Sequence, residues 1–253
     1  MSVNDEMNPP VSFPIKPPGP PKVWKVIETV IKGKENAPIK FSIQEIPEDR
    51  YDEVADYMCT YFIPDEPMCK CSNGKNDPGL VESFRELWKK VLKHGLSIAA
   101  FTENPNGGKP IIAAVNVLVF CHKNDKEDYG NSMPIKPKRI LDVVLDMSKK
   151  AQVYEKYGVD RYMGAFGLSV HPSYRGSAMG GHLLRAREDV GREYNIEVTS
   201  TGFTSPISQK LAERCGFETL FEQNYEELVD EKGNLLFPGI EAKTMKIMAK
   251  RLY

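Results

Sequence analysis

The chain has 253 residues, of which 41% are hydrophobic and 27% are charged, and its formal net charge is -1. This composition is typical of a globular protein that can bury a sizeable core. A charge so close to zero gives no general attraction for nucleic acid or for an anionic membrane, so any charged ligand must be recognised locally.

Apolar runs and cysteines bear on the compartment and on metals. The longest apolar run, Ile111 to Phe120, has about half the length of a bilayer span, and the N-terminus lacks the basic-then-apolar pattern of a signal peptide. Five scattered cysteines favour reduced thiols over a disulfide framework. Cys69-Lys70-Cys71 has no second Cys or His pair at the spacing of a zinc site. We therefore expect a cytoplasmic protein without a metal.

The N-terminal region is rich in proline. Seven prolines fall between residues 9 and 21, which predicts a tail rather than a core element, because proline fixes φ and removes an amide donor. Val23, Ile27, Val30 and Ile31 then fit either a short amphipathic helix or an edge strand. The expected organisation is a Pro-rich tail with a short covering element over residues 1–38, followed by one domain over residues 39–253.

Predicted strands and helices alternate through the rest of the chain. The expected strands are 39–46, 96–102, 110–120, 162–170, 196–201, 217–225 and 241–252, and the expected helices are 49–62, 79–94, 139–157, about 179–194 and 205–215. The order is not the strict βαβ rhythm of a doubly wound sheet. It predicts a mixed α/β (α+β) fold.

The segment from Ser169 to Ala186, SVHPSYRGSAMGGHLLRA, passes from a strand through a Gly-rich turn into a helix. Such a turn exposes the first amides of the helix, and glycines let an anion approach them. The pattern is neither a dinucleotide fingerprint nor a P-loop. It predicts a phosphate site, with a tight turn that binds nothing as the alternative. The helix after the turn carries an apolar stripe that we expect to pack on the sheet, namely Met179, Leu183, Ala186 and Val190. We expect its charged side chains to face elsewhere, namely Arg185, Arg187, Glu188 and Arg192.

Two motifs together resemble the Gcn5-related N-acetyltransferase superfamily. RGSAMG, Arg175 to Gly180, is similar to its acetyl-CoA signature, Gln/Arg-x-x-Gly-x-Gly/Ala, and SQKLAERCGFE, Ser208 to Glu218, is similar to its late helix, which commonly ends in Gly-Phe. Ala178 stands where the first signature glycine is usual. The added methyl group leaves the backbone amides in place, so we expect a somewhat weaker CoA affinity at most.

Further motifs narrow this resemblance to the insect arylalkylamine N-acetyltransferases. IPEDRYDEVADYMCTYFIPDEP, Ile46 to Pro67, and FTSPISQKLAERCGFE, Phe203 to Glu218, are similar to the opening and to the late helix of these enzymes. The resemblance spans about residues 39–252. It implies a central, mostly antiparallel twisted sheet of about seven strands, splayed at the acetyl-CoA site and flanked by helices. It also implies direct acetyl transfer from acetyl-CoA to a small amine such as dopamine, serotonin, tryptamine or octopamine.

The resemblance also assigns the co-substrate site. The strand GLSV would pair with the pantetheine arm through its backbone, and the turn would hold the phosphates. The implied acetyl-CoA contacts are Leu168, Ser169, Val170, Arg175, Gly176, Ser177, Ala178, Met179, Gly180, Gly181, Ser205 and Ser208. Ser205 before Pro206 is expected to act first as a helix N-cap.

Acetyl transfer to an amine requires a base, because an alkylamine is almost fully protonated at neutral pH. The resemblance implies Glu48 as this base, with its pKa raised by partial burial; the plain alternative is a favourable charge at a helix start. Ala212 stands where many superfamily members carry a tyrosine acid, and Thr204 and Ser208 match the functional serines of the insect enzymes. Asp65 and Glu66 are candidate amine-binding carboxylates.

Other acceptors and roles remain open from the sequence. Agmatine or a polyamine is the nearest alternative acceptor, and an aromatic or an acidic pocket would separate the two classes. Acetylation of peptide N-termini is a second enzymatic alternative, and a non-catalytic acyl-CoA-binding protein is a third reading. We expect a monomer that binds a small-molecule amine, with no nucleic-acid or membrane partner.

Overall fold

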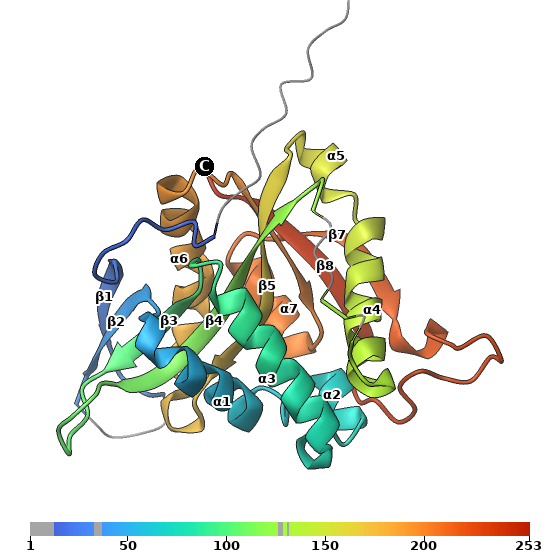
Figure 1. The fold of residues 1–253 in the computed structure, drawn as a ribbon, viewed down its shortest axis with the longest axis horizontal. Coiled ribbons are helices and arrows are strands. Elements are labelled where there is room, and N and C mark those ends of the chain that lie inside the picture. The colour runs from blue at the N-terminus through green and yellow to red at the C-terminus, as the bar shows by residue number, and fades with distance from the viewer. Residues whose placement is uncertain (1–12, 33–36, 126–128, 131) are drawn as a thin grey trace, which may run out of the picture.

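An eight-stranded sheet forms the centre of the molecule and carries helices on both faces (Figure 1). The computed structural model describes residues 13–32, 37–125, 129–130 and 132–253. In spatial order the strands are β1 (Val23–Thr29), β2 (Ile39–Glu45), β3 (Ile98–Thr102), β4 (Ile111–His122), β5 (Arg161–Val170), β6 (Val198–Phe203), β8 (Thr244–Arg251) and β7 (Glu218–Asn224). Neighbouring strands are antiparallel except β5 and β6, which are parallel. The mixed, mostly antiparallel fold predicted from the sequence is confirmed.

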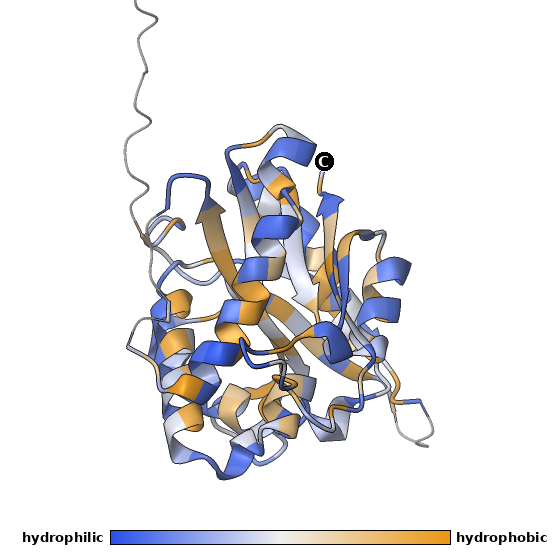
Figure 2. Cartoon of the chain, turned by 90° about the vertical axis from the view of Figure 1, so that its right-hand side faces the viewer, coloured by the Kyte–Doolittle hydropathy of each residue, from blue (hydrophilic) through white to orange (hydrophobic). Residues whose placement is uncertain are grey.

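The helices form two layers. They are α1 (Tyr51–Tyr61), α2 (Pro67–Cys71), α3 (Pro78–Leu92), α4 (Ile135–Lys150), α5 (Val153–Tyr157), α6 (Met179–Glu193) and α7 (Pro206–Arg214). Side chains of β4 alternate between two cores: Val115 and Val117 pack with α1, α3 and α4, whereas Ala114 and Leu118 pack with α6. Long hydrophobic stretches lie on central strands, and the helices alternate between hydrophobic and hydrophilic segments (Figure 2).

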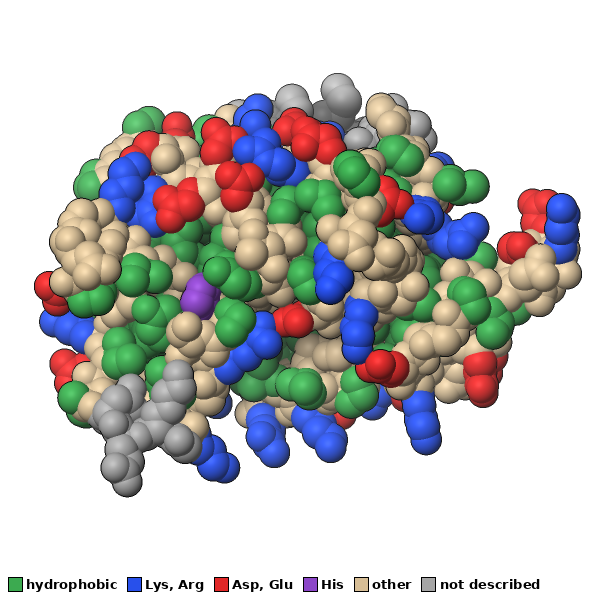
Figure 3. Space-filling model, turned by 90° about the horizontal axis from the view of Figure 1, so that it is seen from below, with side chains coloured by type: hydrophobic (Ala, Val, Ile, Leu, Met, Phe, Trp, Pro, Cys, Tyr) green, Lys and Arg blue, Asp and Glu red, His purple; other side chains and the backbone are tan. Residues whose placement is uncertain are grey.

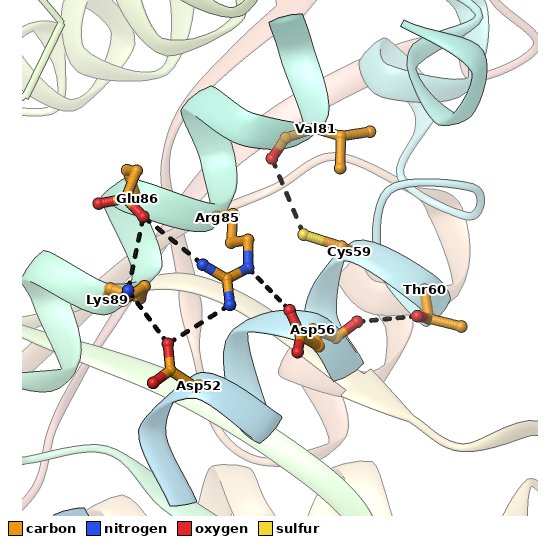
Figure 4. A network of polar contacts seen from close by, with 8 residues as sticks. All are labelled: Asp52, Asp56, Cys59, Thr60, Val81, Arg85, Glu86 and Lys89. Atoms are coloured by element: carbon orange, nitrogen blue, oxygen red, sulfur yellow. Dashed lines mark hydrogen bonds and ion pairs between the residues drawn. The ribbon is translucent and has the colours of Figure 1, made fainter. Parts of the chain in front are cut away.

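An ion-pair network joins α1 to α3 (Figure 4). Arg85 Nε of α3 donates to Asp56 Oδ1 of α1 at 2.7 Å, and Lys89 Nζ of α3 lies 3.0 Å from Asp52 Oδ1 of α1. All four side chains are partly or largely exposed, so each pair contributes little by itself. The network links α3, which contributes Phe84 and Trp88 to the cavity described below, to α1, which is followed directly by the lining residue Phe62.

The structure decides one open alternative for the N-terminal region and corrects one expectation. Of the helix and the edge strand that fit the sequence, residues 23–29 form the edge strand β1, which pairs with β2 and gives the sheet eight strands instead of about seven. Part of the expected tail packs on the body: the ring of Phe13 stacks on His94 with centroids 3.9 Å apart, and Ile15 N donates to His94 O at 3.0 Å. Pro9 and Pro10, in the same predicted tail, lie outside the described residues.

The helix expected over 139–157 is divided. It begins earlier, at Ile135, and α4 ends at Lys150 before the short helix α5. Gln152 separates the two with φ 48°, a left-handed conformation that a right-handed helix cannot contain.

Candidate active site

The sheet opens between β5 and β6. Their register contains one residue pair, Met163 with Thr199, and beyond it the two parallel strands separate. On the other side of β5 the pairing with β4 is interrupted by a bulge between Asn116 and Leu118. Gly167 lies at this bulge with φ +112°, and its carbonyl accepts a hydrogen bond from Asn116 Nδ2 at 2.9 Å. The opening leaves backbone of β5 available to a ligand that pairs as an added strand.

A largely apolar cavity occupies the opening and is lined from both faces of the sheet. Residues 165–168 of β5 form one side of it, here called the β5 bank, and residues 201–203 of β6 with the adjoining Thr204 form the other, the β6 bank. On one face lie side chains of α6 and α7, and on the other lie side chains of α3, α4 and the segment around α2. The remaining lining residues are Phe62, Glu66, Met68, Cys69, Phe84, Trp88, Ile140, Leu141, Val144, Leu184, Arg187, Ser208 and Leu211.

The Gly-rich turn precedes α6 as predicted. Ala178 is the N-cap with φ 59°, and no side chain in the described part of the chain caps this helix end, so its first amides have no side-chain acceptor there. The predicted apolar stripe of α6 is confirmed, since Met179, Leu183, Ala186 and Val190 are buried in the core. The turn therefore combines an accessible helix start with a firmly packed helix.

The signature residues of the turn have different contacts. Gly176 O accepts from Lys32 N at 3.2 Å, and the buried Ser177 hydroxyl donates to Tyr174 O at 2.7 Å. A Cβ at Gly180 would lie 2.9 Å from Leu211 Cδ2, so this glycine permits close packing of α6 on α7. Gly181 has a milder version of the same contact, 3.5 Å to Leu211 Cδ1.

The face of the molecule seen from below shows no continuous basic surface. Hydrophobic side chains lie between separate lysine, arginine and acidic side chains (Figure 3). On this face, attraction for an anion would therefore depend on local groups rather than on a broad basic surface.

Glu66 places a carboxylate in the cavity. It is 7% exposed, and its Oε2 accepts from Cys69 N at 2.7 Å, which caps α2. Its Oε1 is buried and has no hydrogen-bond partner among the residues that the structure describes. Burial raises the pKa of Tyr225, and the negative charge of Glu66 raises it further, so the Tyr225 hydroxyl stays protonated; it donates to Thr204 O at 3.1 Å. A buried carboxylate oxygen without a donor is costly unless a ligand supplies one.

Arg187 is the second charged group of the cavity. It is 1% exposed, which corrects the expectation that it faces away from the packed side of α6. Its Nε donates to Asn116 Oδ1 at 3.0 Å, and its Nη1 donates to Thr199 Oγ1 at 3.0 Å and to Thr201 Oγ1 at 2.8 Å. Burial lowers the pKa of the guanidinium to about 9, which leaves it protonated at neutral pH.

The hydroxyl residues at the start of α7 are close to the cavity. Ser205 is the N-cap and Pro206 follows it, as predicted, and Ser208 completes a capping box. Ser208 Oγ donates to Ser205 O at 2.9 Å, so this hydroxyl is already engaged in the helix start. Thr204 and Ser208 both line the cavity, whereas Ser205 does not.

Two other predicted carboxylates lie elsewhere. Glu48 is exposed, so the expectation of partial burial is wrong, and it lines a separate hollow with Tyr51 and His94. Asp65 is also exposed, and one of its carboxylate oxygens lies 2.5 Å from Arg175 Nη2 in an ion pair. The Nε of the same arginine donates to Val170 O at 3.1 Å. The structure thus joins Asp65 to the Gly-rich turn and leaves Glu66 as the motif carboxylate inside the cavity.

The sequence reasoning missed several residues of the cavity. The aromatic side chains Phe84, Trp88 and Phe166 belong to no recognised motif, and Phe62 lies in the Ile46 to Pro67 motif but was not identified as a site residue. Arg187 carried a usable signal, because it stands in line with Gly180, Leu184 and Gly191 at helical spacing, a row of small or apolar residues in which a charge is unusual.

The described residues contain no group of three or more His, Cys, Asp or Glu side chains that could hold a metal ion, and all five cysteines are free thiols. No helix in the part of the chain that the structure describes is both long and apolar enough to cross a membrane.

Searches against protein-family models and against curated protein sequences found no match. Solved structures do match. A protein of the yellow fever mosquito assigned as arylalkylamine N-acetyltransferase 7 is 32% identical, with 92% of this chain and 96% of that chain covered and a TM-score of 0.83.

Two more distant structures share the fold. Arylalkylamine N-acetyltransferase 2 from Aedes aegypti is 24% identical, with 84% of this chain and 99% of that chain covered and a TM-score of 0.71. The polyamine N-acetyltransferase of Drosophila melanogaster, which forms N-acetylagmatine, is 17% identical, with 83% and 99% covered and a TM-score of 0.71.

The likeness to the mosquito protein that is 32% identical extends over nearly the whole of both chains. The aligned part of this chain is large enough to include both the splayed sheet and the Gly-rich turn. The chain is an acetyl-CoA-dependent amine N-acetyltransferase. It belongs to the insect arylalkylamine N-acetyltransferase family of the Gcn5-related N-acetyltransferase superfamily.

Proposed function

We propose that this enzyme acetylates small arylalkylamines of the dopamine, serotonin, tryptamine or octopamine type, and that Glu66 receives their ammonium group. The observation that carries the proposal is the buried, unpartnered Oε1 of Glu66 in a cavity walled by aromatic rings. An arylalkylamine presents the complementary pair of features, one flat ring and one cation.

The aromatic wall has a defined geometry. The rings of Phe62 and Trp88 meet edge to face with centroids 5.8 Å apart, and Phe84 lies 5.6 Å from Trp88. Trp88 Nε1 donates to Phe166 O at 2.8 Å, so the indole is fixed and its polar group is satisfied. Offset and edge contacts with such rings favour an aromatic ligand by about 0.5–1.5 kcal/mol beyond area burial.

The charges of the cavity favour one ammonium group. Glu66 is the one carboxylate among the described residues that line it. A polyamine or agmatine carries a second cationic group, which would need a second acid or an exit to water. Agmatine or a polyamine is therefore the alternative that the lining fits less well.

The transfer we propose is direct. Glu66 binds the ammonium group and takes its proton, and the neutral nitrogen attacks the thioester carbon of acetyl-CoA. Leu168, Ser169 and Val170 of β5 would pair with the pantetheine arm, and the uncapped start of α6, after Arg175 to Ala178, would bind the diphosphate. Ser208 and Thr204 line the same cavity and would contact the acetyl end.

Two matched variants test the base. Glu66→Gln keeps the shape and the cap on Cys69 N but cannot take a proton, so kcat with tryptamine should fall about 10²–10⁴-fold. Glu48→Gln, at the exposed position, should keep wild-type kcat. Acetyl-CoA affinity, measured by calorimetry, should be unchanged in both. A large loss in Glu48→Gln together with normal turnover in Glu66→Gln would return the role to Glu48.

A panel of amines tests the substrate class. We expect kcat/KM for tryptamine and dopamine to exceed that for agmatine and spermidine. The opposite order would contradict the arylalkylamine assignment while leaving the acetyltransferase activity intact. A cytoplasmic location, a monomeric state and the absence of nucleic-acid and membrane partners stay predictions.

A further inference from the structure

Arg187 is a buried cation that lacks an anionic partner. Its three hydrogen bonds go to the neutral side-chain oxygens of Asn116, Thr199 and Thr201. No carboxylate in the described part of the chain forms an ion pair with it, and its Nη2 donates to no described residue although Arg187 lines the cavity. Burying an ion without a counter-charge costs several kcal/mol, so the position calls for a reason beyond packing.

The partners of Arg187 place it where the sheet opens. Thr199 is the last residue of β6 that pairs with β5, and Thr201 lies on the β6 bank of the cavity. Asn116, at the β4 bulge, accepts from Arg187 and donates to Gly167 O on the β5 bank. The guanidinium is therefore held between both banks, at the closed end of the opening.

The position of Arg187 along α6 relates it to the co-substrate. Ala178 begins the helix at the phosphate-binding turn, and Arg187 follows nine residues later, which corresponds to about 14 Å along the axis. Helical side chains also tilt toward the N-terminus, so the guanidinium approaches the turn. A pantetheine arm that starts at the turn and runs along β5 has its sulfur in this part of the cavity.

We propose that Arg187 stabilises the sulfur of coenzyme A as a thiolate, the product of acetyl transfer. The amine nitrogen forms a bond to the thioester carbon, the carbon–sulfur bond breaks, and its electron pair stays on sulfur. An ammonium group loses two protons on becoming an amide: the first goes to the base before the attack, and the second goes to water as the carbon–sulfur bond breaks. The thiolate takes a proton from solvent after release. This role needs no acid at Ala212, where many members of the superfamily carry a tyrosine, and it rests on acetyl transfer alone rather than on the class of amine.

The test compares coenzyme A with desulfo-coenzyme A, which lacks the sulfur, by calorimetry between pH 6.5 and 8.5 without any amine. If Arg187 lowers the pKa of the bound thiol by one unit from about 8.5, the preference for coenzyme A rises about fivefold over this range. Desulfo-coenzyme A has no thiol and reports whether the rest of the site is intact.

Three variants assign the effect. In Arg187→Met the preference should stay flat with pH while the affinity for desulfo-coenzyme A is retained, and Arg187→Lys should keep part of the rise. Cys215 is the titratable neighbour that acts on Arg187, and Cys215→Ser should preserve the wild-type rise. A flat wild-type preference overturns the proposal even if Arg187→Met fails to fold. A rise that survives in Arg187→Met, or equal loss of both ligands, overturns it as well.

Discussion

Gly167 is the position where a single added methyl group should disturb the site most. Its φ of +112° is a conformation that other residues rarely adopt, and forcing alanine into it costs about 1–3 kcal/mol. The new Cβ would also lie 2.8 Å from Met58 Cε and 3.0 Å from Phe62 Cε2. Overpacking of this kind costs a further 1–3 kcal/mol, typically. Gly167→Ala should therefore destabilise the fold by about 2–6 kcal/mol.

Thermal unfolding measures this loss, with Gly158→Ala as the matched control. Gly158 also has positive φ, +65°, but a Cβ there meets nothing within 4 Å, so only backbone strain of about 1–2 kcal/mol is expected. At about 2–4 °C per kcal/mol for a chain of this size, the two variants should differ clearly in Tm. The folded fraction of Gly167→Ala should also show a raised KM for acetyl-CoA. Equal Tm values for the two variants would refute the steric argument.

Three further predictions concern the turn, the N-terminus and the helix network. Ala178→Gly removes left-handed strain of about 1–2 kcal/mol at an entropic cost of about 0.5–1 kcal/mol, so melts should show a gain of about 0.5–1 kcal/mol with CoA affinity unchanged or modestly tighter. Deleting residues 1–21 removes the stacking of Phe13 on His94, so Tm should fall while kcat is retained; lost kcat would mean that this segment shapes the site. The hydrogen bond from Lys89 holds the pKa of Asp52 below its usual 3.8. The ionised Asp52 therefore stabilises the fold at pH values above 3.8, and this stabilisation is lost as the pH falls through the lowered pKa. In acid, Asp52→Asn should therefore lose less Tm than the wild type, and parallel curves would contradict this.

Periodicity was sufficient to predict most of the fold. Alternation or a continuous apolar run identified β2 to β8, and amphipathic spacing identified α1, α3, α6 and α7. The helices bury one face, whereas β3 and β4 are buried on both faces and therefore appear as apolar runs. The first strand was ambiguous, since Val23, Ile27 and Val30 fit a helix as well as an edge strand. The break at Gln152 was not predictable, because a left-handed glutamine has no local sequence signature.

The site was predicted less completely than the fold. Motif resemblance identified Asp65 and Glu66 together and did not show which of them lies in the cavity. The structure distinguishes them, because Asp65 forms an ion pair with Arg175, a residue far away in the sequence. Charge composition indicated that Arg187 faces away from the core, and the structure buries it because three polar side chains from two strands, β4 and β6, accept its hydrogen bonds. Such long-range contacts have no counterpart in single-sequence patterns.

The single residue pair between β5 and β6 also divides the sheet mechanically. Five strands lie on one side of it and three on the other, so backbone hydrogen bonds contribute little to holding the two parts together at this boundary. In the free enzyme the three-stranded part, together with α7, can unfold locally as a separate cooperative unit, and its backbone amides then exchange hydrogen with the solvent. A co-substrate that contacts both banks ties the parts together, and its binding energy then protects amides far from any atom it touches.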